Sequence, residues 1–189
     1  MRDINGDVRT DGPALVWHGP PDAPTLLVLD PGGEAKHGGL PATWRPLADH
    51  LRIGWQRLAD VDDVERRLPN EGAVHLVTSG PAAEAVLRLA ARHPGQVQSV
   101  VLVDPPPEVE GLRRELAEQR VIVRTFVSNE DDPAVRVPKP VPLGHPDVVG
   151  RLVETLLSLE PQHGEIADDW QRIRASVEDA MRRARSGGA

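Results

Sequence analysis

The sequence predicts an α/β fold in which a mainly parallel sheet is flanked by helices. Short runs of β-branched and aliphatic residues alternate along the chain with segments of helical periodicity. The run Val97–Val103 is apolar and β-branched nearly throughout, which is typical of a strand covered on both faces. Residues 75–104 give the order strand, sharp turn, helix, strand, which is the repeating unit of such a sheet.

The N-terminal part predicts three strands and two helices. Residues 14–17 and 25–30 are apolar runs separated only by GPPDAP, so we expect a hairpin or an adjacent strand pair. Pro31-Gly32-Gly33 ends the second run. Residues 44–51 then predict a helix, residues 53–58 a strand, and residues 61–68 a short helix with its charges facing outward.

The middle of the chain predicts a strand, a helix and a second strand. Residues 75–77 form a short apolar run that Gly80-Pro81 breaks, and residues 82–92 are good helix formers with one apolar face. Pro94-Gly95 separates this helix from the strand Val97–Val103.

The remaining elements follow three prolines at 105–107, which end that strand. Residues 111–119 predict a helix, residues 121–127 a strand and residues 148–159 a helix. Residues 165–185 predict an extra amphipathic helix, since Ile166, Trp170, Ile173, Val177 and Met181 recur at helical spacing. We expect this helix to pack on the body of the domain or on a second copy, which would make a homodimer.

Length and composition exclude several classes of protein. The 189 residues fit a single domain spanning 1–189, and the absence of cysteine excludes a thiol nucleophile and thiolate metal sites. The N-terminus is polar and no apolar run approaches the roughly 20 residues that span a bilayer, so we expect a cytoplasmic protein. The abundance of Ala, Arg, Asp, Gly and Pro resembles the bias of a high-GC genome.

Charge and motifs argue against several ligands. The net charge of −7, without a basic block, disfavours nucleic acid and anionic membranes. The chain contains no G-x-G-x-x-G, no Gly-Lys-Ser/Thr and no H-E-x-x-H, so we expect no cofactor and no metal.

The segment from His75 to Asp104 resembles the nucleophile-elbow region of the α/β-hydrolase superfamily, in which a strand ends in small-x-Ser-x-small and a helix follows. When the helix and the following LAARHP…VVLVD are matched, the serine position falls on Gly80, between the small residues Thr78 and Ala82. The nucleophile is absent in this register. The next residue, Pro81, has no backbone N–H to lend to an oxyanion hole.

Two other interpretations of this turn stay open. A shift of one residue makes Ser79 the nucleophile and Gly80 the oxyanion donor, but Val77 and Pro81 then occupy positions that should be small, so that elbow would be strained. Alternatively, Ser79 is an N-cap and Pro81 begins a helix, with no chemistry.

The resemblance implies further site residues. The loop LDPGG is similar to the loop that supplies the other oxyanion donor, which gives Gly32 and Gly33 that role. Asp132 and His145 match the family's acid and histidine in chain order, so Asp132 would orient His145 as general base. They are only thirteen residues apart, which leaves little room for the usual strand and helix between them.

The resemblance implies a compact α/β-hydrolase-like fold without a lid domain, and three hypotheses follow. The first is a degenerate relative, a pseudoenzyme that binds a small-molecule or acyl ligand or a protein partner. The second is a weak esterase or thioesterase that uses Ser79, His145 and Asp132. The third is a flavodoxin-like α/β domain unrelated to hydrolases.

Overall fold

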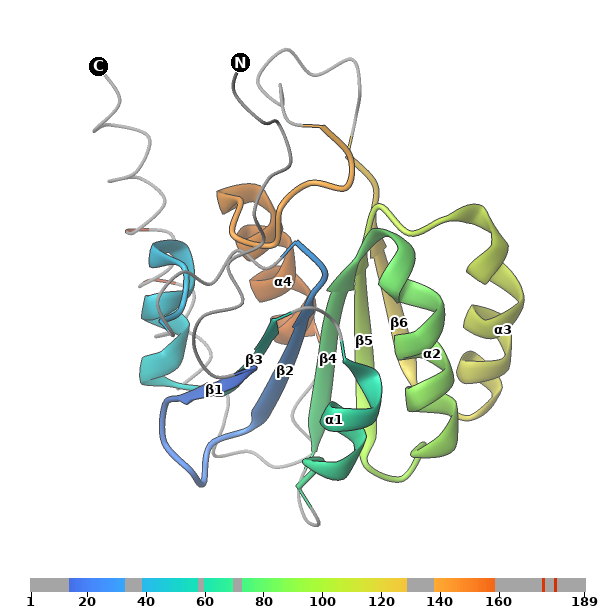
Figure 1. Ribbon diagram of the computed structural model, residues 1–189, viewed down its shortest axis with the longest axis horizontal. Helices are drawn as coiled ribbons and strands as arrows, with labels where there is room; N and C mark the ends of the chain where they lie inside the picture. Colours follow the sequence, from blue (N-terminus) through green and yellow to red (C-terminus); the bar gives the residue numbers. More distant parts are fainter. Residues whose placement is uncertain are drawn as a thin grey trace, which may run out of the picture.

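A six-stranded sheet forms the centre of the computed structural model, which describes residues 14–32, 39–57, 60–69, 73–128 and 138–158 and the helical positions 175 and 179 (Figure 1). The strands are β1 (Leu15–His18), β2 (Thr25–Asp30), β3 (Arg52–Arg57), β4 (Val74–Ser79), β5 (Val97–Val103) and β6 (Ile122–Phe126). Their order is β1-β3-β2-β4-β5-β6, and only β1 is antiparallel to its neighbour. The predicted fold class, a mainly parallel sheet flanked by helices, is confirmed.

The expected pairing of the first two strands is wrong. β1 pairs with β3 in the register Leu15↔Gln56 to His18↔Ile53, and β3 also pairs with β2 on its other side. β3 therefore lies between the two strands that the sequence places next to each other. The GPPDAP segment therefore passes over the end of β3 to connect β1 with β2, and it does not form a tight hairpin turn.

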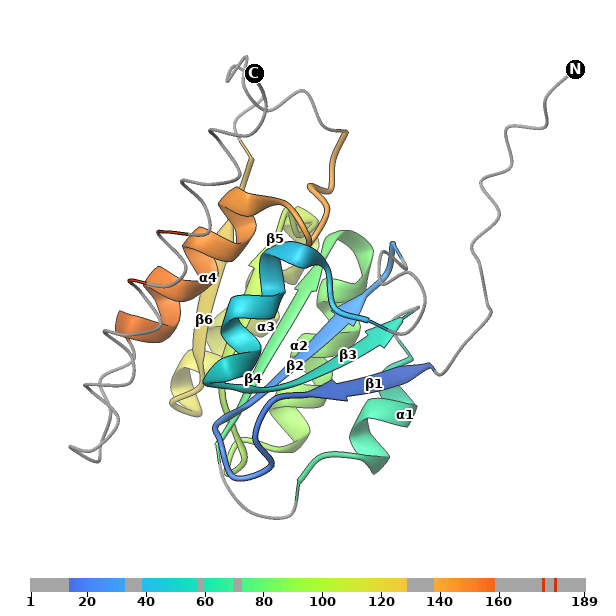
Figure 2. The ribbon, with the colours of Figure 1, turned by 90° about the vertical axis from the view of Figure 1, so that its left-hand side faces the viewer.

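Helices cover both faces of the sheet (Figures 1 and 2). One face carries the 3₁₀ helix η2 (Ala42–Asp49) and α4 (Pro146–Ser158), and the other carries α1 (Val61–Arg66), α2 (Ala83–Arg92) and α3 (Glu110–Glu118). Two short 3₁₀ turns, η3 (Gly80–Ala82) and η4 (Pro107–Val109), precede α2 and α3. All helices predicted before residue 160 are present, with ends displaced by at most two residues.

The core consists of two apolar layers, one on each face. Leu26 and Val28 of β2 point into the layer under η2 and α4, whereas Leu27 and Leu29 point into the layer under α1, α2 and α3. All four are fully buried, as expected for a parallel strand covered on both faces. In the first layer the rings of Trp44 and Trp55 meet edge to face, with centroids 5.0 Å apart.

The connections in the second half of the chain are short. Residues 104–121 between β5 and β6 contain only η4 and α3, and residues 138–145 before α4 contain no strand. The helix expected at 165–185 lies outside the described residues, apart from positions 175 and 179. Within the described ranges no helix is both long and apolar enough to cross a bilayer.

Candidate functional site

The strand order creates a topological switch point at the carboxyl end of the sheet. The chain leaves β2 towards β3 on one side and returns to β4 on the other side of β2. In open α/β sheets, ligands bind outside the carboxyl ends of the strands at such a point. Here the point lies between Asp30 to Gly32, where β2 ends, and Ser79-Gly80, where β4 ends.

Gly80 makes the sharp turn from β4 into η3. Its φ of +54° lies in the left-handed region, which glycine adopts without the steric penalty of a Cβ. This is the residue that the matched register places at the serine position of a nucleophile elbow. Pro81 follows in the first turn of η3, so no backbone N–H is available there to stabilise an oxyanion.

Pro140 fills the space in front of Gly80. A Cβ added to Gly80 would lie 2.8 Å from Cγ of Pro140 and 3.3 Å from its Cβ, distances shorter than carbon atoms in contact tolerate. The Lys139–Pro140 peptide bond is cis. A side chain of any kind at position 80 therefore requires Pro140 to move.

The segment that carries Pro140 is fixed to the rest of the fold by three hydrogen bonds. The backbone N–H of Val141 donates to Asp104 Oδ2 at 2.9 Å. On the η2 side, Trp44 Nε1 donates to the carbonyl of Leu143 and Thr43 Oγ1 to that of Gly144, both at 2.8 Å. Val141 and Leu143 are each 1% exposed, so apolar burial holds the segment as well.

Asp104 connects three loops at this end of the sheet. It follows β5 with a φ of 45°, and its Oδ1 accepts hydrogen bonds from the backbone N–H and the hydroxyl of Ser128, which follows β6. With the bond from Val141, one carboxylate joins β5, β6 and the segment before α4. Sequence reasoning missed this residue, although a carboxylate directly after a buried parallel strand is a detectable signal.

Ser79, the candidate nucleophile of the shifted register, is the last residue of β4. It has extended backbone (φ −133°, ψ 155°), it is 4% exposed, and it pairs with Val103 of β5. Its hydroxyl forms no hydrogen bond with His145. As the residue before η3 it has the expected N-cap position, but its side chain makes no capping hydrogen bond.

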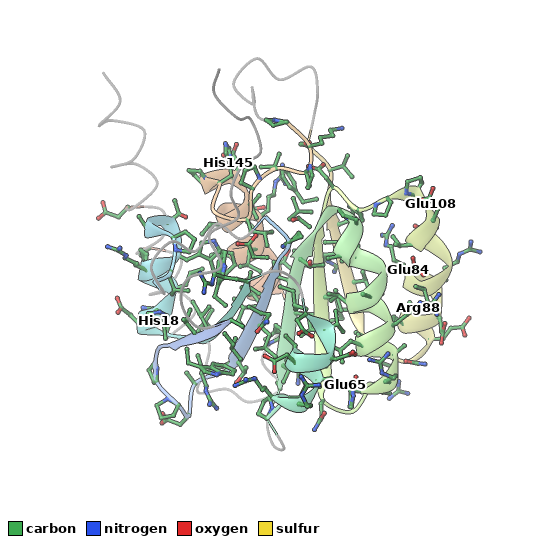
Figure 3. All side chains as sticks on the ribbon, viewed as in Figure 1. His18, Glu65, Glu84, Arg88, Glu108 and His145 are labelled. Carbon is green, nitrogen blue, oxygen red and sulfur yellow. The ribbon has the colours of Figure 1, made fainter. Side chains whose placement is uncertain are left out.

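His145, the candidate general base, lies at the start of α4, at the carboxyl end of the sheet (Figure 3). Its carbonyl accepts hydrogen bonds from the N–H groups of Val148 and Val149. Its Nδ1 accepts from the backbone N–H of Asp147 at 3.3 Å and lies 3.7 Å from Asp147 Oδ2. These contacts are those of a residue that begins a helix. Asp132, its proposed partner, lies outside the described residues.

Gly32, a candidate oxyanion donor, uses its backbone N–H locally. That N–H donates to Asp30 Oδ1 at 3.0 Å, while Asp30 Oδ2 accepts from Trp55 Nε1 at 3.1 Å. Asp30 is 1% exposed, so this short turn is anchored in the interior. Gly33, the other candidate, lies outside the described residues. Within the described ranges, no three His, Asp or Glu side chains are grouped to hold a metal ion.

Among comparisons with known proteins, only the comparison with solved structures finds proteins similar to this chain. No protein-family model matches the chain. No curated protein sequence matches it. The carboxylesterase CesB from Bacillus subtilis has a TM-score of 0.34 at 19% identity over 61% of this chain and 63% of its own. Cfl2 from Burkholderia cenocepacia has a TM-score of 0.36 at 18% identity over 90% and 69%.

An ancestral haloalkane dehalogenase has a TM-score of 0.34 at 18% identity over 88% of this chain and 73% of its own. The chain spans less than two thirds of the length of the carboxylesterase. At these TM-scores the likeness supports no statement about activity.

Proposed function

We propose that this chain is a non-catalytic domain of α/β-hydrolase-like fold, which binds a small-molecule or acyl ligand or a protein partner at the carboxyl end of its sheet. The single observation that carries the proposal is Gly80, which makes a left-handed strand-to-helix turn with Pro140 against it. A hydrolase elbow presents its nucleophile on such a turn. Here the turn holds no side chain, and the space for one is filled.

The parts that would assist a nucleophile are also lacking in the described structure. Pro81 has no N–H, the N–H of Gly32 is bonded to Asp30, and His145 Nδ1 is bonded within its own helix start. In a serine hydrolase, loss of the nucleophile alone lowers turnover on the order of 10⁶-fold. We therefore expect no ester or thioester hydrolysis above the solvent rate.

The proposal extends to the setting of the domain. Residues 1–189 form one domain without a lid, the protein is cytoplasmic, and it binds neither nucleic acid nor membranes, in keeping with its net charge of −7. The amphipathic sequence 165–185 makes a homodimer. Light scattering of the full chain and of a chain ending at residue 160 tests the dimer, which the truncation should abolish.

A flavodoxin-like domain is the second candidate, and the strand order favours it. The five parallel strands run β3-β2-β4-β5-β6, which corresponds to the flavodoxin-like order 2-1-3-4-5. Such domains bind FMN at the same switch point. The antiparallel β1 at the sheet edge and the Gly80 turn favour the hydrolase-like alternative. Quenching of FMN fluorescence on titration with the protein would support the flavodoxin-like alternative.

Activity-based labelling tests the proposal. The purified chain, Ser79→Ala, His145→Ala and the control His50→Ala, a residue at the end of η2, are treated with a fluorophosphonate probe and with short p-nitrophenyl esters. We expect no labelling and no turnover in any of the four. Labelling that is lost in Ser79→Ala and His145→Ala but kept in His50→Ala would overturn the proposal and establish a serine hydrolase.

A further inference from the structure

A groove far from the switch point lies between α3 and β6, at the opposite edge of the sheet from β1 (Figure 1). Its volume is about 570 Å³. α3 supplies Glu110, Arg113, Arg114 and Ala117, and the turn and strand that follow supply Arg120, Val121, Ile122, Val123 and Arg124. We call this the α3–β6 groove.

The lining shows that the groove runs along the edge of β6. Positions 110, 113, 114 and 117 lie on one face of α3. Val121 directly precedes β6, and residues 122 to 124 are consecutive within it, so the strand contributes both its faces and the backbone between them. Because β6 pairs only with β5 in the described part of the chain, its outer backbone groups are left for another strand.

The α3–β6 groove is positively charged in a protein of net charge −7. It contains four arginines and one glutamate, and Glu110 pairs with Arg113 at 2.6 Å. Arg114, Arg120 and Arg124 form no ion pair with any described residue. Nε of Arg113 is buried without a hydrogen-bond partner there. An occupant with carboxylates would pair with Arg114, Arg120 and Arg124.

Exposed apolar side chains accompany the charge. Ile122, within β6, is 37% exposed and Val127, just beyond it, is 63% exposed. Apolar and charged side chains therefore both lie beside the free strand edge. An extended peptide that alternates acidic and apolar residues matches this arrangement, because its successive side chains point to opposite faces.

We propose that the α3–β6 groove binds an acidic, extended segment of another protein, which adds to β6 as a further strand. Charge decides against a second copy of this chain, since edge-to-edge pairing would place arginines against arginines. A free phosphate or nucleotide would satisfy the arginines, but it would leave the backbone of β6 and Ile122 without partners. The proposal is independent of the function proposed for the switch point.

A designed peptide tests both the strand and the charge. Fluorescein-labelled Glu-Val-Glu-Val-Glu-Val is titrated with the full-length protein and binding is followed by anisotropy. We expect saturable binding that weakens by about tenfold or more when the salt is raised from about 50 mM to 500 mM, because exposed charges are screened. Absence of saturable binding would overturn the proposal.

Protein variants test the charge of the groove. Arg124→Glu should weaken binding of the acidic peptide by about tenfold or more and allow Lys-Val-Lys-Val-Lys-Val to bind instead. The control Arg66→Glu changes an exposed arginine of α1, outside the groove, and should leave both affinities unchanged. If Arg124→Glu and Arg66→Glu lowered the affinity for the acidic peptide equally, binding would depend on net charge alone, and the α3–β6 groove would not be the binding site.

A backbone-modified peptide tests strand addition. The same acidic peptide with alternate amides N-methylated keeps its charge but cannot form the ladder, so it should lose binding. Hydrogen exchange of residues 122–126 should slow when the unmodified peptide is bound. Equal binding of the methylated peptide, or full competition by triphosphate or by an oligonucleotide at equal charge, would show a general anion site and overturn strand addition.

Discussion

The ring of Pro140 lies against Gly80, with Cγ 2.8 Å from the place that a Cβ at position 80 would occupy. The two residues are far apart in the chain, since Gly80 directly follows β4 and Pro140 precedes α4. Position 80 requires glycine for two independent reasons, which are its left-handed φ of +54° and the lack of room for a side chain. The second reason depends on Pro140 staying in place.

Gly80→Ala should destabilise the fold by about 3 kcal/mol. The left-handed backbone costs a residue with a Cβ roughly 1–2 kcal/mol, and overpacking against Pro140 adds about 1–3 kcal/mol. Urea unfolding followed by tryptophan fluorescence measures this loss. An unchanged midpoint would contradict both the left-handed backbone at position 80 and the contact with Pro140.

Two further variants separate the causes. Gly111→Ala, in the first turn of α3 where a Cβ meets no atom within 4 Å, should be neutral or stabilising by up to about 1 kcal/mol. In Gly80→Ala combined with Pro140→Gly, the contact is relieved but the backbone penalty stays. The alanine should therefore cost less in the Pro140→Gly background than in the wild type, by about half.

Asp104→Ala should loosen the segment that holds Pro140. The change removes the acceptor of bonds from Ser128 and Val141, and it places alanine at a φ of 45°. Hydrogen bonds to a charged acceptor contribute about 1.5–3 kcal/mol each, so we expect a loss of about 3 kcal/mol or more. Faster hydrogen exchange at the amide of Val141 is the specific measurement.

Asp104→Asn is the matched control for the backbone. Asparagine tolerates the left-handed region and keeps one acceptor oxygen, so it should lose roughly half as much stability as alanine. If both variants exchanged the Val141 amide at the wild-type rate, the carboxylate would not be what tethers this segment.

The sheet was predictable because its central strands β2 and β4, and nearly all of β5, are buried on both faces. β2 and β5 have the predicted ends, since predominantly apolar runs such as Val97–Val103 mark a covered parallel strand directly. The position of β1 was not predictable from local sequence. Its pairing with β3 joins residues about 40 apart, for which no turn signal exists in the chain.

The candidate site was predictable only in part. The turn at Gly80 was predictable, because a glycine followed by a proline after an apolar run is a strong turn signal. The roles of Pro140, Asp104 and Trp44 depend on contacts between residues far apart in the chain, which periodicity does not encode. Sequence reasoning therefore found the turn but not what covers it.

Glu65→Gln should weaken the attachment of α1 to α2. Glu65 accepts hydrogen bonds from Arg92 at 2.7 and 3.0 Å and lies 2.7 Å from His93 Nε2; the bonds from Arg92 and then from His93 lower its pKa to about 2. Because the group is partly exposed, we expect a loss of about 1 kcal/mol or less at pH 7.

The pair Glu84 and Arg88 on the surface of α2 supplies the control, since Glu84→Gln breaks an exposed i,i+4 bridge and should cost less (Figure 3). A carboxyl pKa below its unfolded value stabilises the fold above pH 4.5, and this contribution declines as the pH falls towards 2. An NMR titration of Glu65 that gave an ordinary carboxyl pKa would contradict the prediction.

His75 should make the stability of the fold fall in mild acid. It lies in β4, 5% exposed, with Nδ1 2.8 Å from Ser99 Oγ of β5, and burial lowers its pKa from 6.5 to about 4. Neutral His75 is therefore the form that the fold accepts, while the unfolded chain takes up a proton below pH 6.5. The contribution of His75 to the free energy of unfolding is fully present above that pH and declines by about 3 kcal/mol as the pH falls to about 4.

Urea unfolding between pH 8 and pH 4 measures this pH dependence of stability. His75→Val combined with Ser99→Ala removes both partners of the bond and should flatten this part of the profile. If the stability of the double variant fell equally steeply with pH, groups other than His75 would cause the acid sensitivity.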